Sequence, residues 1–168
     1  MKKKIASALF IGRFQPFHDG PMSAIRDAAR SSDKLTIVVA GPAKPDAKNP
    51  FSFAERKRMI KLALSSAKIK NYAVRELRDV NDDKKWSHAI ARLGRFDVAY
   101  SRNPWTSRCL KLAGIPVAKH KFHARYKNCG RTIRERITHH KNWSALVPPA
   151  VYKYVLKING EERIRKSF

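Results

Sequence analysis

Residues 5–18 have the sequence IASALFIGRFQPFH, in which a mostly apolar run leads directly into a short turn. The run lacks the strict alternation of a strand with one wet face. It therefore predicts a strand covered on both faces, as in a parallel sheet. Parallel strands place the segments that follow them at one edge of the sheet, where ligands bind. The stretch thus predicts the first strand of an α/β fold and a ligand-binding turn after it.

Strand-like and helix-like segments alternate along the rest of the chain. The predicted strands are short apolar runs over residues 5–11, 35–40, 72–77, 96–100 and 115–118. One helix is predicted after the capping box Ser52-Phe53-Ala54-Glu55, with apolar residues at helical spacing at Ile60, Ala63, Leu64 and Ala67. A second is predicted before the stop signal Gly94, with the same spacing at Trp86, Ala89, Ile90 and Leu93. Another helix is predicted over residues 148–158. This alternation predicts a Rossmann-like, doubly wound parallel sheet of about five strands with helices on both faces.

The size of the chain suits one domain. Its 168 residues are 43% hydrophobic and contain no evident linker, repeat or low-complexity stretch, so we expect a single domain over residues 1–168. No run approaches the ~18 apolar residues of a membrane span, and no membrane association is expected. Cys109 and Cys129 lack C-x-x-C spacing, so neither a metal cluster nor a disulfide is predicted. A reducing cytoplasm is the expected compartment.

The charge of the chain is extreme for one domain. Lys and Arg number 37 against 13 Asp and Glu, which gives a formal net charge of +24. Such a field attracts polyanions, including nucleotides and nucleic acid. Basic residues occur along the whole chain, so a general property of the source proteome explains the charge as well as a dedicated, non-specific nucleic-acid surface does.

The turn after the first predicted strand carries residue types that bind phosphate. Gly12 lets the backbone approach a ligand closely, and Arg13 supplies positive charge. His18 stands just before a helix expected to start near residues 19–21, and Pro21 suits the first turn of that helix. An imidazole near a helix N-terminus can donate to a phosphate and stabilise charge that develops during phosphoryl transfer.

Five segments resemble a known family in the same order along the chain. The string Gly12-Arg13-Phe14-Gln15-Pro16-Phe17-His18 resembles the nucleotidyltransferase superfamily with the H-x-G-H signature, and specifically its archaeal-type nicotinamide-nucleotide adenylyltransferases. The other four segments are Lys48-Asn49-Pro50-Phe51 with Glu55-Arg56, Asp79-Val80-Asn81 with Trp86, Tyr100-Ser101-x-Asn103-Pro104, and Asn159-Gly160-x-Glu162-Arg163-Ile164. Together they extend the resemblance over nearly the whole chain.

The resemblance implies an adenylyl transfer. Nicotinamide mononucleotide attacks the α-phosphate of ATP, which releases pyrophosphate and forms NAD without a covalent enzyme intermediate. Mg²⁺ is expected to be held mainly by the phosphates and by water, with no metal-ligand set on the protein. The enzyme then acts by positioning and by electrostatic stabilisation. The family resemblance also implies a homo-oligomer.

The resemblance also implies roles for individual residues. The implied catalytic residues are His18, Arg13, Lys48 and Arg134. The implied ATP-binding residues are Gly12, Arg13, Phe14, His18, Arg131, Thr132, Ile133 and Arg134, with C-terminal helices from about residue 130 completing the phosphate site. The implied residues for nicotinamide mononucleotide are Asp79, Asn81, Trp86 and Asn103.

The chain departs from the family pattern at three places. Pro21 stands where the motif has its second histidine, which removes a side-chain donor and a backbone N–H. Cys129 and Arg131 replace the serine and threonine of a Ser-x-Thr-x-x-Arg signature whose arginine is Arg134. Arg102 replaces a loop glycine. In addition, Thr132-Ile133-Arg134-Glu135 fits a capping box and predicts a helix that starts at Thr132.

Several alternatives remain open on the sequence alone. Trp86 has helical core spacing and suits packing as well as stacking on a nicotinamide ring. Asp79 and Asn81 also suit a turn, and Lys48 suits an exposed loop. For the whole chain, the alternatives are a nucleotidyltransferase with another nucleotide or acceptor, and a non-catalytic nucleotide- or nucleic-acid-binding protein.

Overall fold

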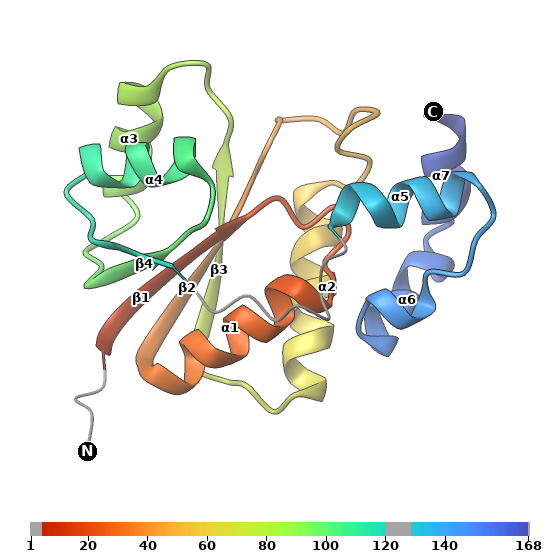
Figure 1. Ribbon diagram of the computed structural model, residues 1–168, viewed down its shortest axis with the longest axis horizontal. Helices are drawn as coiled ribbons and strands as arrows, with labels where there is room; N and C mark the ends of the chain where they lie inside the picture. The colour runs from red at the N-terminus through yellow and green to blue at the C-terminus, as the bar shows by residue number, and fades with distance from the viewer. Residues whose placement is uncertain (1–4, 120–128, 168) are drawn as a thin grey trace. The chain divides into compact units, whose positions relative to one another are not determined.

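The strands between residues 5 and 118 form a five-stranded, all-parallel sheet (Figure 1). The computed structural model describes residues 5–119 and 129–167. The strand order is β3-β2-β1-β4-β5, which places β1 at the centre of the sheet. The strands are β1 (Ile5–Gly12), β2 (Ser32–Gly41), β3 (Tyr72–Arg78), β4 (Val98–Tyr100) and β5 (Val117–Ala118). The prediction of about five parallel strands in an α/β fold is confirmed.

The helices are α1 (Asp19–Ser31), α2 (Phe53–Ser66), α3 (Asp83–Ala91), α4 (Pro104–Leu112), α5 (Gly130–Thr138), α6 (Pro149–Lys157), α7 (Gly160–Lys166) and the short 3-10 helix η2 (Ser144–Leu146). Polar side chains fix several of their starts. The predicted capping box at α2 is confirmed, because Ser52 Oγ accepts from the Glu55 N–H at 3.3 Å and Glu55 Oε2 accepts from the Ser52 N–H at 2.8 Å. Asp82 caps α3, and Asn103 caps α4.

Some predicted boundaries are wrong. β4 begins at Val98 rather than at residue 96, because the Asp97 carboxylate takes the Ser7 N–H at 2.8 Å in place of a ladder carbonyl. β5 is likewise shorter, with Val117 as its first residue. The helix α5 begins at Gly130, two residues before the predicted Thr132, since the Cys129 carbonyl already accepts from the Ile133 N–H. The capping box expected at Thr132 is therefore not what starts this helix.

Contact density divides the chain into two compact units, each described by itself. The first unit contains residues 1–12, 24–41 and 71–121, which include the sheet, α3 and α4. One of its cores is formed by alternate strand residues together with residues of both helices: Leu9, Val38, Leu77, Trp86, Ile90, Ala99, Cys109, Leu110 and Ile115. The strand residues between them, such as Ala8, Phe10 and Ile37, are buried as well. Both faces of the sheet are thus covered, as continuous apolar runs predict.

The second unit contains residues 13–23, 42–70 and 122–168, with α2, α5, α6 and α7. Within it, α2 contacts α6 and α5 contacts α7. A Cβ added at Gly160 would lie 2.9 Å from the ring of Phe51 and 3.0 Å from the Val155 carbonyl oxygen, so only glycine lets α7 start this close to its neighbours. Within the described ranges, none of the helices combines the length and apolar character that a membrane crossing needs.

An ion pair in the second unit joins α7 to the start of α2. Arg163 Nη1 donates to both carboxylate oxygens of Glu55, at 2.8 and 2.9 Å, and to the Pro50 carbonyl at 3.1 Å. Burial opposes ionisation of Glu55, but the hydrogen bonds from Arg163 and Ser52 outweigh it and lower the pKa of the carboxyl. Glu55 thus serves both the capping box and the attachment of α7.

Candidate functional site

The turn after β1 is tied to the segment that precedes α2. Gln15 is buried, and its side-chain amide makes two hydrogen bonds with the backbone of Phe51. Its Nε2 donates to the Phe51 carbonyl at 3.0 Å, and its Oε1 accepts from the Phe51 N–H at 2.9 Å. The Gln15 amide thus pairs with the Phe51 backbone as a neighbouring strand residue would, and it fixes the turn although no strand lies there. Sequence reasoning gave Gln15 no role, although a polar amide between apolar residues was a usable signal.

A buried arginine supports the same turn from α2. Arg56 is 2% exposed and donates from Nη1 to the Arg13 carbonyl at 2.9 Å. The Arg13 side chain is exposed and donates to Asn49 Oδ1 at 3.4 Å. Lys48, next to Asn49, is exposed, and its N–H is fixed by Asp46 at 2.8 Å. Arg13 and Lys48 are both implied in catalysis, and the structure brings Arg13 to the loop that carries Lys48.

Phe14 and Gly12 lie on either side of Arg13 with different surroundings. Gly12 is the last residue of β1 and pairs with Val39. Phe14 is buried, and its ring centroid lies 5.5 Å from that of Phe17. Its φ of +52° is in the left-handed region, which is uncommon for a residue with a bulky side chain. Such outliers cluster at binding and catalytic sites, where surrounding contacts hold them.

His18 follows in the same turn with a defined tautomer. Its Nδ1 accepts from the Gly20 N–H at 3.2 Å, which assigns the proton of the neutral ring to Nε2. Burial lowers the pKa of His18 from 6.5 to about 4. The imidazole is consequently neutral at physiological pH and presents Nε2–H as a donor. The His18 carbonyl accepts from the Met22 N–H at 3.1 Å, so the residue lies where α1 begins.

α5 touches the turn through Arg134 and Gly130. Arg134 Nη1 donates to the Gln15 carbonyl at 2.6 Å. A Cβ added at Gly130 would lie 2.8 Å from the same carbonyl oxygen, so the start of α5 is in close backbone contact with the turn. Burial lowers the pKa of the Arg134 guanidinium, whose Nε is buried without a hydrogen-bond partner among residues 5–119 and 129–167. The turn that carries His18 thus has an incompletely satisfied arginine beside it.

Other residues at the start of α5 differ in where they point. Ile133 is fully buried, so its side chain packs in the core of the second unit. Arg131 is exposed and forms a 2.9 Å ion pair with Glu135 along the helix. Thr132 Oγ1 lies 3.6 Å from the sulfur of Cys129, which occupies the N-cap position. The N-terminal backbone of α5 is nevertheless a favourable place for an anion.

The two cysteines are expected to react very differently with alkylating reagents. Burial opposes ionisation of Cys129, but hydrogen bonds from the backbone of Thr132 and from its hydroxyl outweigh it and lower the pKa of the thiol. Burial raises the pKa of Cys109, which is 0% exposed. With limiting iodoacetamide at neutral pH, mass spectrometry should find Cys129 modified at least about tenfold faster than Cys109. Equal rates, or faster labelling of Cys109, would contradict the assigned environments.

The first unit holds the residues implied in binding nicotinamide mononucleotide. The Asp79 N–H donates to the Gly41 carbonyl at 2.9 Å, just after β3, and Asn81 is exposed. Asn103 Oδ1 accepts from the Thr106 N–H at 2.9 Å and caps α4. Trp86 is 1% exposed and packs in the core. Its indole Nε1 is buried and has no hydrogen-bond partner in the described part of the chain.

Trp86 is supported by a cluster that sequence reasoning missed. The ring of Trp105 meets Trp86 edge-on at 4.9 Å between centroids. Trp105 Nε1 donates to Asp83 Oδ1 at 2.7 Å, and Arg108 Nη2 donates to Asp83 Oδ2 at 2.6 Å. Hydrogen bonds from Trp105 and Arg108 lower the pKa of Asp83. Asp83 therefore stays charged and holds Trp105 against Trp86.

Comparisons with known proteins agree with one another. The cytidylyltransferase-like family model matches residues 9–147. The nicotinamide-nucleotide adenylyltransferase of Methanolobus tindarius is 41% identical over 94% of this chain and 92% of its own length. That of Halorubrum lacusprofundi is 33% identical over 94% of this chain and 90% of its own.

A solved structure shows the same fold. The bifunctional NMN adenylyltransferase/ADP ribose pyrophosphatase of Francisella tularensis superposes with a TM-score of 0.80 at 22% identity and covers 96% of this chain. The chain spans about half the length of that bifunctional protein, 52%. At this identity the likeness concerns the Rossmann-like fold alone.

Proposed function

Because the chain belongs to the cytidylyltransferase-like family and, within it, to the nicotinamide-nucleotide adenylyltransferases, we propose that it makes NAD and pyrophosphate from ATP and nicotinamide mononucleotide. The alternatives left open by the sequence, another acceptor or a non-catalytic binding protein, are not favoured by relatives that share this name over nine-tenths of the chain. The observation that carries the proposal at the site is the turn itself, where a neutral His18 presents an Nε2–H donor.

In the proposed reaction, a phosphate oxygen of nicotinamide mononucleotide attacks the α-phosphorus of ATP. A new P–O bond forms as the bond to the β-phosphate oxygen breaks, and the electron pair leaves with pyrophosphate. His18 Nε2–H donates to a phosphate oxygen, while Arg13, Lys48 and Arg134 stabilise the charge that spreads over the phosphates. The rest of the rate enhancement comes from holding the two nucleotides in line.

Further ATP and nicotinamide contacts belong to the same proposal. For ATP, support comes from Gly12 at the end of β1, from the left-handed backbone of Phe14 and from the helix N-terminus formed by residues 130–134. For nicotinamide mononucleotide, support comes from the indole N–H of Trp86, which has no partner among the described residues, and from Asp79, Asn81 and Asn103, which follow β3 and β4.

Mg²⁺ fits this site only as a complex with ATP. The described residues contain no group of three or more His, Cys, Asp or Glu side chains that could hold a metal ion. The charged side chains proposed to face the phosphates are cations, which repel a bare metal ion. Mg²⁺ would therefore be held by the triphosphate and water, and it would neutralise charge on the phosphates. A single domain, a homo-oligomer and a cytoplasmic location complete the proposal.

The direct test is incubation of the purified protein with ATP, nicotinamide mononucleotide and Mg²⁺, followed by chromatography of the products. We expect NAD and pyrophosphate in equal amounts, with a rate proportional to enzyme concentration. Replacing nicotinamide mononucleotide by other phosphorylated acceptors should reduce product formation at least about tenfold. Absence of NAD above an enzyme-free blank would overturn the proposed function.

Substituting Pro21→His is expected to raise kcat. Pro21 lies in the first turn of α1, where the family motif places its second histidine, so the substitution restores a donor beside the phosphates. We expect a gain of about tenfold, within the range of one positioned donor. Steady-state NAD formation measures it. Pro149→His, at a first-turn proline of α6, is the matched control and should leave kcat unchanged. An unchanged or lower kcat in P21H would contradict the expectation.

A further inference from the structure

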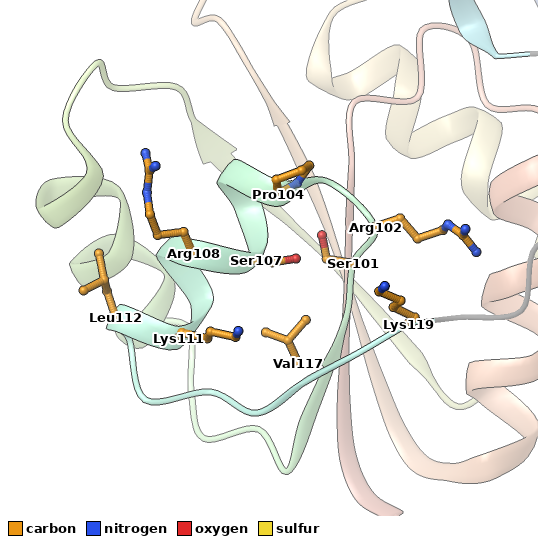
Figure 2. Close-up of a pocket in the computed structure, with 9 residues that line it drawn as sticks. All are labelled: Ser101, Arg102, Pro104, Ser107, Arg108, Lys111, Leu112, Val117 and Lys119. Atoms are coloured by element: carbon orange, nitrogen blue, oxygen red, sulfur yellow. The ribbon is translucent and has the colours of Figure 1, made fainter.

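A basic pocket lies in the first unit, between the segment after β4, the helix α4 and the end of β5 (Figure 2). Its volume is about 700 Å³, within the usual range for small-molecule sites. Its lining residues are Ser101, Arg102, Pro104, Ser107, Arg108, Lys111, Leu112, Val117 and Lys119. None of them is among the residues proposed above to bind ATP or nicotinamide mononucleotide.

The pocket wall carries cations and hydroxyls but no carboxylate among the described residues. Figure 2 shows the Lys111 and Lys119 side chains and the hydroxyls of Ser101 and Ser107 extending toward the space between α4 and the end of β5. Lys111 comes from α4, whereas Lys119 follows β5, so the two ammonium groups approach from different elements.

The two arginines contribute differently from the lysines. The guanidinium of Arg108 extends away from the space in Figure 2 and is neutralised by Asp83, to which it donates at 2.6 Å. The guanidinium of Arg102 also extends away in this view. Aliphatic parts of both side chains therefore belong to the wall, and the positive charge that faces inward comes from the lysines.

One of the hydroxyls is held in position by its own loop. Ser101 is 7% exposed, and its Oγ accepts from the Asn103 N–H at 3.2 Å. The Oγ–H remains available to turn toward an acceptor, with the Asn103 carbonyl 3.4 Å away as its weak local partner. Two ammonium groups and two hydroxyls around one space suit an anion with several oxygens, and Lys is a common phosphate ligand. Pro104 and Val117 add an apolar wall suited to the carbon part of a ligand.

We propose that this pocket binds the phosphate monoester group of a small organic ligand, with Lys111, Lys119, Ser101 and Ser107 around the phosphate. The proposal goes beyond the adenylyl transfer, because it assigns a second phosphate-binding function to residues that the transfer does not use.

The test is a ³¹P NMR or calorimetric titration with ribose 5-phosphate and, in a separate arm, inorganic phosphate. The variant Lys111→Gln/Lys119→Gln removes both inward cations from exposed positions. Lys153→Gln/Lys157→Gln on α6 is the matched control, since it removes the same charge from two exposed lysines of another helix. Thermal melting verifies that both variants are folded.

We expect K111Q/K119Q to weaken ribose 5-phosphate binding at least about tenfold, the scale of losing charge-assisted contacts. The control variant and His18→Ala should bind as the wild type does, and ribose 5-phosphate should bind several-fold tighter than inorganic phosphate. Equal affinity in K111Q/K119Q, an equal loss in the control, or loss in H18A with retention in K111Q/K119Q would each overturn the proposal. If inorganic phosphate bound as tightly as ribose 5-phosphate, the claim that the pocket recognises an organic phosphate would be overturned.

The outcome is separable from that of the proposed function. K111Q/K119Q should form NAD with a kcat within about twofold of wild type, because neither lysine belongs to the proposed transfer machinery. A protein that forms no NAD but loses ribose 5-phosphate binding in K111Q/K119Q alone would overturn the transfer and support the pocket.

Discussion

Replacing His18 by alanine is expected to lower kcat/KM for NAD formation by about 10²–10³-fold, the usual cost of removing one donor that stabilises charge in a transition state. The donor is Nε2–H, since Nδ1 is engaged by the Gly20 N–H at 3.2 Å. Most of the loss should appear in kcat, because the charge on the phosphate oxygens grows as the reaction proceeds. Steady-state kinetics with saturating Mg²⁺ and varied ATP measures both parameters.

The matched control is His88→Ala, a substitution of an exposed histidine on α3. It should leave both parameters within about twofold of wild type, as expected for a surface site. His18→Asn should retain part of the activity, because an amide can still donate a hydrogen bond. If H18A and H88A behaved alike, His18 would have no role in the transfer.

His18 should also make folding stability depend on pH. Burial lowers its pKa to about 4 in the folded protein, against 6.5 for an ordinary histidine. Between these values the unfolded chain binds more protons, so stability falls as the pH drops below 6.5. The expected loss from His18 is about 3 kcal/mol at pH 4. Urea unfolding of wild type and H18A at pH 7 and pH 4 measures it, and an equal pH dependence in both would contradict the lowered pKa of the half-buried His18.

Substituting Gly130→Ala is expected to separate α5 from the turn that carries His18. The new Cβ would lie 2.8 Å from the Gln15 carbonyl oxygen and 3.2 Å from its carbon, and backbone atoms cannot rotate away as a side chain can. We expect a loss of about 1–3 kcal/mol of stability, as in other overpacked sites. The KM for ATP should rise at least about tenfold, because Arg134 also reaches the turn through that carbonyl. Thermal unfolding and ATP kinetics measure the two effects.

The direction in which G130A changes stability shows whether the contact with Gln15 or the helix propensity of alanine dominates. Alanine in a helix is favoured over glycine by about 0.5–1 kcal/mol, which would stabilise the variant if α5 could move without cost. A more stable G130A with an unchanged KM for ATP would show that the contact with Gln15 is unimportant. Cys129→Ala is the neighbouring control for stability, since this side chain is exposed and its removal leaves the Gln15 contact intact.

Much of the fold could be predicted because its signals are local. A continuous apolar run such as residues 35–40 predicts a buried strand from its own composition, and the capping box at Ser52 and Glu55 marks the start of α2 within four residues. The weaker boundaries depend on distant partners. Asp97 sets the start of β4 through its hydrogen bond with Ser7, 90 residues away in the chain, and no local pattern around residue 96 contains that information.

The candidate site divides in the same way. The string from Gly12 to His18 was visible because its residues are contiguous. The contacts that support that string could not be predicted, because they join residues far apart in the chain. Gln15 forms hydrogen bonds with Phe51, 36 residues away, and Arg56 donates to the Arg13 carbonyl, 43 residues away. Trp86 shows the limit most clearly, because its spacing is correct for a core helix. Only its contact with Trp105, and an indole N–H that has no partner in the described ranges, distinguish it from an ordinary packed tryptophan.

The ion pair between Arg163 and Glu55 has a consequence for biosynthesis. The two residues are 108 positions apart, so a ribosome makes α2 long before it makes the arginine that holds α7 to it. β1 and β2 precede α2 in the chain, and the remaining strands β3, β4 and β5 emerge in the meantime. We expect the nascent chain to complete its sheet before α5 reaches the Gln15 carbonyl and before α7 attaches to α2. Affinity for ATP should accordingly be among the final properties that a newly made molecule gains.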